Sequence, residues 1–237
     1  MTTKGAKHMI GTMNTPRRFL SIFLLLGLMV SVPTDARAGN DAKELVIKSE
    51  IALGNLLNNP DYHTLQALLN DARGVLIFPS LLKVGFFYGV EGGNGVLLAR
   101  NSDGTWGYPA FFTMGAMSVG LQFGGQDSET ILAIMTDRGI ESIIDQEVKL
   151  GADLSVAVGT VGLGAEAATT AQLADIYAFS RPRGVYAGVS FEGALIHGRE
   201  DLNEEFYGSR TSVTEIVVQK KHSSTDADKL RSLLGNQ

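Results

Sequence analysis

The first amphipathic pattern of the chain lies in residues 41–58, where hydrophobic side chains recur at the spacing of an α-helix. Glu44, Lys48 and Asn55 fall on the opposite side of this predicted helix. Ile47 and Ile51 lie beside the apolar stripe and widen it. The stripe itself consists of Leu45, Val46, Ala52, Leu53, Leu56 and Leu57. A face this broad is suited either to packing on the rest of the fold or to lying on a lipid bilayer, and both alternatives stay open here.

A second helix is expected directly after the first. Asn59 supplies a capping side chain and Pro60 a preset first turn. Gly74 is expected to close this helix, because glycine is common just past a helix end. The apolar positions of the helix follow at i, i+3, i+4 and i+7 and are Leu65, Leu68, Leu69 and Ala72.

After the second helix the pattern changes to short β-rich runs that contain many glycines. Val75–Phe78 is expected to be a buried strand that Pro79 ends. Apolar and polar residues alternate over 153–158 and 185–192, which is the period of a half-buried strand. Most of the 28 glycines fall in this region. Because glycines within strands permit bulges and sharp coiling, we expect a strongly curved antiparallel sheet or a closed barrel.

Helical patterns return toward the C-terminus. One short helix is predicted over residues 137–145, inside the β region. Ser212–Glu215 and Thr225–Asp228 fit capping boxes that would begin two C-terminal helices. Helices, then strands, then helices is the order of an α+β fold and not of alternating α/β units. The sequence shows no repeat or linker in residues 39–237, so we expect one domain there.

The N-terminal segment has the pattern of a secretory signal peptide. Arg17 and Arg18 precede an apolar run over residues 19–32, and Ala36-Arg37-Ala38 forms a small-residue cleavage site. The alternative is an uncleaved anchor helix, but the run is too short to span a bilayer comfortably. We therefore expect residues 1–38 to be a signal peptide with its leader. Cleavage near Ala38 would export the domain, to the periplasm where the host has two membranes.

Charge and cysteine content narrow the function classes. The chain has a formal charge of −5, and residues 1–38 carry five basic residues and one acid, so the exported part would have −9. This acidity argues against nucleic acid, because affinity for nucleic acid comes largely from neutralising phosphates. Attraction to anionic lipid would need a local basic patch. The absence of cysteine excludes disulfides, thiolate metal sites and cysteine nucleophiles.

No residue cluster predicts catalysis, and we expect neither an enzyme nor a metal nor a cofactor. His63 and His197 have no spacing that would join two metal ligands. Ser118 lies in a segment similar to a nucleophile elbow, but its flanks predict a continuing strand and not the required strand-to-helix turn. The glycine-rich residues 159–164 lack the Lys-Ser/Thr ending of a P-loop. A hydrolase that uses Ser118 or converging carboxylates is the weakest alternative. The carboxylates considered are Glu91, Asp153, Glu166 and Glu192.

Several blocks of the chain resemble the SYLF domain family. The resemblance covers about residues 41–220, nearly the whole predicted domain. The matching blocks are residues 72–79 with 83–86, 92–110, 120–124, 176–180, 184–193 and 203–208.

The resemblance implies lipid binding. Eukaryotic members of the family bind phosphoinositides, and bacterial members are often exported, single-domain proteins. Membrane contact in the family is associated with an amphipathic N-terminal helix and basic residues. Lys43 and Lys48 on the first helix match best and Lys83 less well, while the two guanidinium groups of Arg181-Pro182-Arg183 suit phosphate chemically.

The sequence therefore predicts a non-enzymatic phospholipid-binding protein at the envelope membrane. Because the chain is strongly acidic and lacks a companion module, only lipid as a class transfers from the family. A structural or adaptor protein that binds another envelope protein is the alternative. The candidate lipid-binding residues are Lys43, Lys48, Lys83, Arg181 and Arg183. Each is equally explained as a solvated surface charge.

Overall fold

The structure is a computed structural model. It describes Met1 and residues 41–85, 88–119, 124–145, 147–159, 174–183, 191 and 193–235. Residues Arg37–Gln237 form one compact unit, separate from Met1–Ala36. The expected signal peptide lies outside the described residues, as do most of the alternating run 185–192 and the glycine-rich run after Gly159. The signal peptide and the domain boundary at residue 39 stay predictions.

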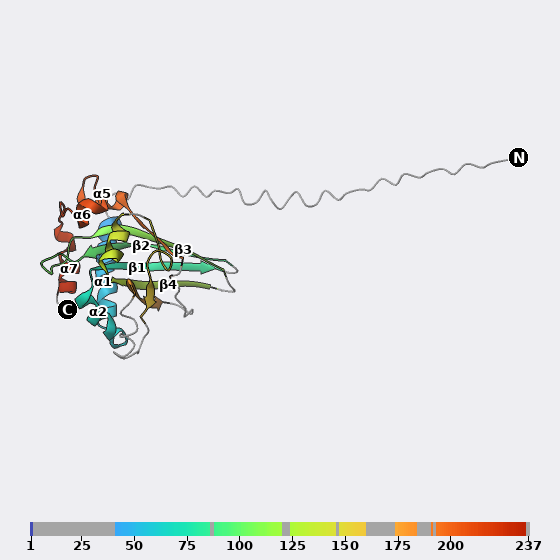
Figure 1. Ribbon diagram of the computed structural model, residues 1–237, viewed down its shortest axis with the longest axis horizontal. Helices are drawn as coiled ribbons and strands as arrows, with labels where there is room; N and C mark the ends of the chain where they lie inside the picture. Colours follow the sequence, from blue (N-terminus) through green and yellow to red (C-terminus); the bar gives the residue numbers. More distant parts are fainter. Residues whose placement is uncertain are drawn as a thin grey trace. The chain divides into compact units, whose positions relative to one another are not determined.

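Eight strands of the Arg37–Gln237 unit form one sheet, in the order β5-β8-β3-β2-β1-β4-β7-β6. All neighbouring strands are antiparallel except β6 and β7. The sheet curls into a half-barrel (Figure 1), which confirms the predicted curved sheet and decides against a closed barrel. The strands are β1 (Gly74–Gly85), β2 (Tyr88–Ala99), β3 (Ala110–Val119), β4 (Gly124–Ile134), β5 (Val148–Lys149), β6 (Val156–Val158), β7 (Ile176–Arg183) and β8 (Leu195–Gly198).

Helices precede and follow the main strands, as the α+β prediction requires. Within the described unit the labelled helices gather toward one end of the strands, whereas β1–β4 extend beyond them (Figure 1). The α-helices are α1 (Asp41–Leu57), α2 (His63–Asp71), α3 (Asp137–Asp145), α5 (Glu200–Tyr207), α6 (Val213–Val217) and α7 (Asp228–Gly235). Two 3-10 helices precede α2 and α7, η1 (Pro60–Tyr62) and η2 (Thr225–Ala227).

Local sequence signals explain several helix ends. The Asn59 side chain accepts a hydrogen bond from the Asp61 amide, so it caps η1 as predicted. Ser212 and Glu215 form the predicted capping box of α6. Helix α5 ends at Gly208, whose φ of 72° is a left-handed conformation that glycine adopts readily.

Four element boundaries differ from the sequence predictions. Helix α2 ends earlier than expected, with Ala72 already extended, so Gly74 begins β1 and does not cap a helix. Pro79 does not end β1 but lies inside it, at a β-bulge where the missing proline N–H is tolerated. The second capping box is wrong, because Ser224 caps η2. Strand β6 begins only at Val156, since Leu154 forms just an isolated bridge.

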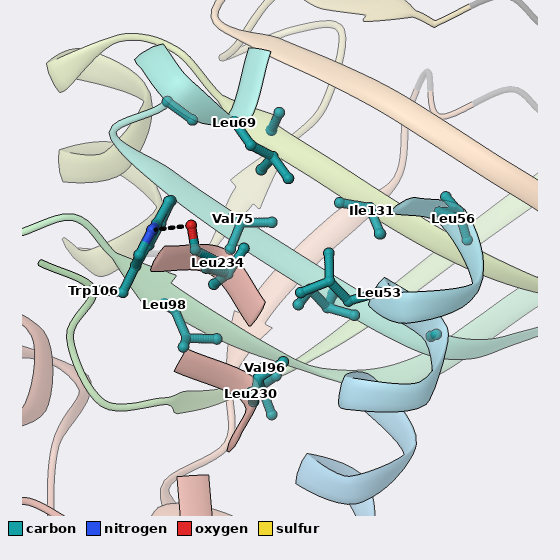
Figure 2. Close-up of a cluster of buried hydrophobic side chains, with 14 of the residues drawn as sticks. Leu53, Leu56, Leu69, Val75, Val96, Leu98, Trp106, Ile131, Leu230 and Leu234 are labelled. Carbon is teal, nitrogen blue, oxygen red and sulfur yellow. Dashed lines mark hydrogen bonds between the residues drawn. The ribbon is translucent and has the colours of Figure 1, made fainter. Parts of the chain in front are cut away.

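Two hydrophobic cores lie on the two faces of the sheet. The α1 face, as we call the first, carries Ile77 of β1 and Val96 of β2, and α1, α2 and α7 cover it. Figure 2 shows Leu53 and Leu56 of α1 and Leu230 and Leu234 of α7 over these strands. The opposite face packs against α3 and α6 through Ile143 and Ile216.

One glycine of β2 is required by a close backbone approach. A Cβ on Gly93 would lie 3.0 Å from Leu81 Cδ2 and closer still to the Ser80 carbonyl oxygen. Ser80 and Leu81 lie in the bulge of β1. The bulge therefore fits against β2 only because position 93 has no side chain.

Candidate functional site

The broad apolar stripe of α1 is part of the protein core. Ala52, Leu53 and Leu56 are fully buried and Val46 nearly so. Of the two uses that the sequence left open for this stripe, the structure shows packing on the sheet. The stripe is therefore not a surface available to a bilayer.

A second, narrower apolar strip of α1 faces away from the sheet. Ile47 is 51% exposed and Ile51 is 54% exposed, one helical turn apart. Lys43 lies one turn before Ile47, and Lys48 directly follows it. We call these four residues the outer strip. It combines apolar side chains with two ammonium groups, which is the composition of an interfacial helix surface.

Both lysines of the outer strip are paired with carboxylates near the surface. Lys43 Nζ lies 2.9 Å from Asp226 Oδ2, and Lys48 Nζ lies 2.7 Å from Glu44 Oε1, one turn earlier. All four side chains are between 43% and 58% exposed. Exposed pairs of this kind contribute little to stability, so the ammonium groups can exchange these partners for others.

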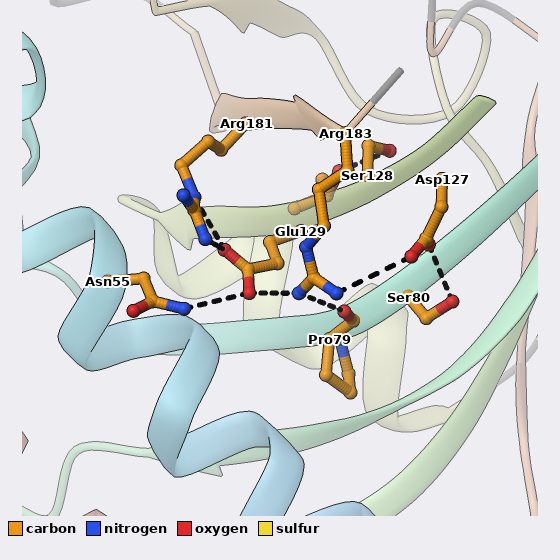
Figure 3. Close-up of polar contacts among 9 residues, drawn as sticks. Asn55, Pro79, Ser80, Asp127, Ser128, Glu129, Arg181 and Arg183 are labelled. Carbon is orange, nitrogen blue, oxygen red and sulfur yellow. Dashed lines mark hydrogen bonds and ion pairs between the residues drawn. The ribbon is translucent and has the colours of Figure 1, made fainter.

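The two candidate arginines converge on Glu129 instead of standing free. Arg181 Nη2 lies 2.6 Å from Glu129 Oε2, and Arg183 Nη2 donates a hydrogen bond to Glu129 Oε1 (Figure 3). Asn55 of α1 donates to Glu129 Oε1 at 2.9 Å. Arg183 Nη1 also lies 3.5 Å from Asp127 Oδ2. This Glu129 cluster fixes the end of α1 to β4 and β7.

Sequence reasoning missed Glu129 and Asn55 as members of this cluster. Glu129 is 1% exposed although it is ionisable. The signal that was available is positional, since Glu129 lies two residues before Ile131 on the same face of a strand. A carboxylate at an inward position requires a cationic partner, and Arg181 directly opposite on β7 supplies it.

Lys83 lies apart from the other candidates, on the sheet face opposite α1. Its side chain is 12% exposed and its Nζ lies 3.9 Å from Glu91 Oε2. Burial raises the pKa of the Glu91 carboxyl, and the Lys83 ammonium opposes this shift. The structure thus brings Arg181 and Arg183 together, places Lys43 and Lys48 on one helix and separates Lys83 from both groups.

Several of the catalytic and metal-binding candidates from the sequence lie among the described residues. No three potential metal ligands come together among them, and His63 Nδ1 lies 3.1 Å from the Pro60 carbonyl oxygen. The backbone at Ser118 pairs with Gly89 inside β3, so the strand-to-helix turn of a nucleophile elbow is absent there. Asp153 accepts a hydrogen bond from the Lys149 amide in a turn, while Glu166 and Glu192 lie outside the described residues. Within the described residues, no helix has the length and apolar character needed to cross a membrane.

Comparison with known proteins identifies the family. The profile described as "Las17-binding protein actin regulator", Ysc84, matches residues 115–237, just over half of the chain. LAS seventeen-binding protein 3 of Saccharomyces cerevisiae is 33% identical over 154 residues, which are 63% of this chain and 33% of that protein. Protein YSC84 of the same yeast is 31% identical over 171 residues, 70% of this chain and 36% of that protein.

A human relative, SH3 domain-containing YSC84-like protein 1, is 28% identical over 179 residues, which are 75% of this chain and 52% of that protein. The chain thus spans between about a third and about a half of these relatives. The fold, the ordered blocks noted in the sequence and the profile match agree. The chain belongs to the Ysc84 family, the family of the SYLF domain.

Proposed function

We propose that this protein is an exported, non-enzymatic domain that binds phospholipid peripherally at the envelope membrane. The outer strip of α1 would rest in the bilayer interface while Lys43 and Lys48 bind headgroup phosphates. The observation that carries the proposal is the exposure of Ile47 and Ile51 between these two lysines. Membership of the Ysc84 family supports it, because the sequence resemblance to SYLF domains implies lipid as the ligand class.

The geometry favours shallow contact without any rearrangement of the fold. Ile47 and Ile51 already face solvent, so they can enter the interface while the buried side of α1 stays on the sheet. Two isoleucines supply only a small apolar contact, so the lysines must contribute. A lysine near an anionic surface adds about 1 kcal/mol, an amount that salt reduces.

Flotation with liposomes tests the proposal. The unit of residues 37–237 is used, because its cores lie within it and the apolar run 19–32 would itself enter bilayers. We expect binding to vesicles that contain phosphatidylglycerol, with weakening as salt rises. The double variant Lys43→Glu/Lys48→Glu should lose at least tenfold in affinity. Unchanged affinity in that variant would remove the outer strip from the mechanism.

The matched control is Arg210→Glu/Lys221→Glu. Both residues are exposed and lie in surface pairs, with Glu200 and Glu215. This control changes the net charge by the same amount as the α1 variant. A loss of affinity confined to the α1 variant would assign binding to the helix, whereas equal losses would assign it to overall charge alone.

Export is tested separately, by fractionation and by mass spectrometry of the N-terminus. We expect a mature chain that begins near Gly39 and is recovered outside the cytoplasm. A full-length chain in the cytoplasm would refute this part of the proposal and leave lipid binding untouched.

Binding of a protein partner is the second candidate. It is favoured by the family's description as Las17-binding and actin-regulating and by the names of the yeast relatives. The acidic net charge of the chain would also favour contact with a basic protein partner. If the unit binds no vesicle of any composition but retains a stoichiometric protein partner in a pull-down, this second candidate replaces the first.

A further inference from the structure

The α1 face of the sheet is covered by helices at one end and exposes an apolar surface at the other. Five hydrophobic side chains lie there, with exposures between 42% and 81%. We call them the distal patch. They are Leu82 and Val84 of β1, Val90 of β2, Met117 of β3 and Leu195 of β8.

The strand register places all five side chains on one face. Val84 lies opposite Val90, and Val90 lies opposite Met117, so these three form a row across β1, β2 and β3. A parallel row begins at Leu82 and ends at Leu195, with Gly92 and Gly115 between them. Because glycines have no side chain, this second row is a shallow apolar floor between two leucines.

The distal patch lies on the same face as α1. In β2 the pairing with β3 continues without a shift from Val90 to Val96, so both side chains point the same way. Val96 belongs to the core beneath α1. The covering helices gather at the other end of the strands (Figure 1), and the paired residues Asn94 and Thr113 lie on this face between the core and the patch.

At this end of the sheet the aliphatic side chains are exposed, whereas the charged side chains beside them in sequence are buried. Lys83 and Glu91 alternate with the patch residues but point to the opposite face, where they are about 10% exposed. Gln126 lies beside Lys83 on that face and is 5% exposed. The charged side chains are therefore covered while the aliphatic ones are open, the reverse of what water alone would select.

Apart from Lys83, Glu91 and Asp127, the last of which pairs with Leu82, the sequence of these strand ends also lacks charge. No residue in 84–90 or in 104–126 is charged, although 19% of the chain is. A protein–protein interface of ordinary size buries about 800 Å² per partner, whereas five half-exposed side chains offer roughly a few hundred Å². A second copy of the chain or another globular partner thus fits this surface poorly. An apolar medium without its own shape fits it well.

We propose that the distal patch is a second membrane-contact surface, which enters the interfacial region of a phospholipid bilayer. This inference rests on the proposed lipid binding and adds an apolar contact to the electrostatic one of α1. Its contribution depends on buried apolar area and not on charge, so it persists in high salt and on zwitterionic vesicles.

A single labelled cysteine reports directly on the patch. The chain contains no cysteine, so Met117→Cys in the unit of residues 37–237 can carry an environment-sensitive dye at one position only. The matched control is Val218→Cys, since Val218 is 57% exposed and follows α6, away from the patch. On phosphatidylcholine vesicles with added phosphatidylglycerol, we expect a blue shift at position 117 and none at position 218.

A polar variant then measures the energetic share of the patch. Val84→Thr/Val90→Thr/Met117→Gln keeps strand-compatible shapes at exposed positions, and its thermal midpoint should match that of the parent. Each half-exposed apolar side chain is worth about fivefold in partitioning, so the triple variant should lose at least tenfold in high-salt vesicle affinity. Val218→Thr should lose none.

The outcomes separate the two proposals. Flotation of the parent with no dye response at position 117 overturns the distal patch and leaves lipid binding by α1 intact. Absence of flotation in any vesicle overturns both. A blue shift at position 117 that appears without vesicles and grows with protein concentration would show that a second copy covers the patch, and would also overturn the inference.

Discussion

Replacement of Glu129 by glutamine would test how firmly α1 is fixed to the sheet. Glu129 is buried, and it accepts bonds from Arg181, Arg183 and Asn55. Glutamine has nearly the same volume but no charge. The variant therefore leaves two guanidinium groups facing each other across a neutral amide, and it weakens the bond that Asn55 of α1 donates to the cluster.

The size of the effect follows from how far the arginines can reach water. Removing one partner of a fully buried pair costs about 3–5 kcal/mol, because the other charge is left uncompensated. Here Arg181 is 35% and Arg183 47% exposed, so both can partly rehydrate and the cost must be reduced. We expect Glu129→Gln to lower the free energy of unfolding by about 2 kcal/mol. For a unit of this size that corresponds to about 4–8 °C in thermal midpoint.

Urea unfolding followed by circular dichroism and by Trp106 fluorescence measures this loss. Glu200→Gln is the matched control, because Glu200 is 61% exposed and lies 3.9 Å from Arg210, and it should change stability by less than about 0.5 kcal/mol. Adding Arg183→Gln to the parent and to Glu129→Gln gives the coupling free energy between Glu129 and Arg183, which we expect to be about 1–2 kcal/mol. If Glu129→Gln behaves like the control, the cluster does not stabilise the docking of α1.

Two further predictions concern Asp175 and the glycines of the sheet. Burial alone would raise the pKa of Asp175, but hydrogen bonds from Thr136 and Ser155 outweigh it and lower that pKa below the ordinary value of 3.8. The carboxylate therefore stabilises the fold above that value, and the stabilisation is lost as pH falls through the lowered pKa. Asp175→Asn should cost about 1–3 kcal/mol at pH 7 and progressively less below pH 4 in urea titrations, and a pH-independent loss would contradict this. Gly93→Ala should destabilise the fold by about 2 kcal/mol or more in the same assay, because its new Cβ would collide with Ser80 and Leu81. Gly115→Ala is the control and should be neutral or stabilising, because no atom lies within 4 Å of its new Cβ. Equal effects of the two variants would refute the role of the bulge.

The parts of the fold that sequence predicted well are those set by local periodicity. The helix over 41–58 was recognised because its apolar residues follow the helical period over several turns, and the short helix predicted over 137–145 is α3. The bulge at Pro79 was missed because it depends on Gly93 in the next strand, not on neighbours in sequence. The prediction that Gly74 closes the second helix failed similarly, since that residue pairs with both β2 and β4.

The candidate site was predictable only in part, since sequence shows which side chains are basic but not which carboxylates meet them. Arg181 and Arg183 were chosen for their guanidinium geometry, and Glu129 uses that geometry in the fold. Lys43 and Lys48 lie on the predicted helix, with Ile47 and Ile51 exposed beside them. Their role in lipid binding stays a prediction. The distal patch could not be assembled from sequence, because only strand register shows which face each residue joins.

The burial of α1 also constrains how this protein could meet a membrane. Lifting the helix off the sheet would expose at least Leu53, Leu56 and Val46, at about 1.5–3 kcal/mol for each side chain, and would break the bond from Asn55 to Glu129. That sum is a large fraction of the 5–15 kcal/mol that typically holds a domain together. Lipid would rebury the lifted stripe, but the sheet face beneath it, with Ile77 and Val96, would stay uncovered. We therefore expect α1 to stay packed on the sheet when the protein binds a membrane. Affinity then comes from the outer strip of α1 and from other exposed apolar surfaces on the same face of the sheet.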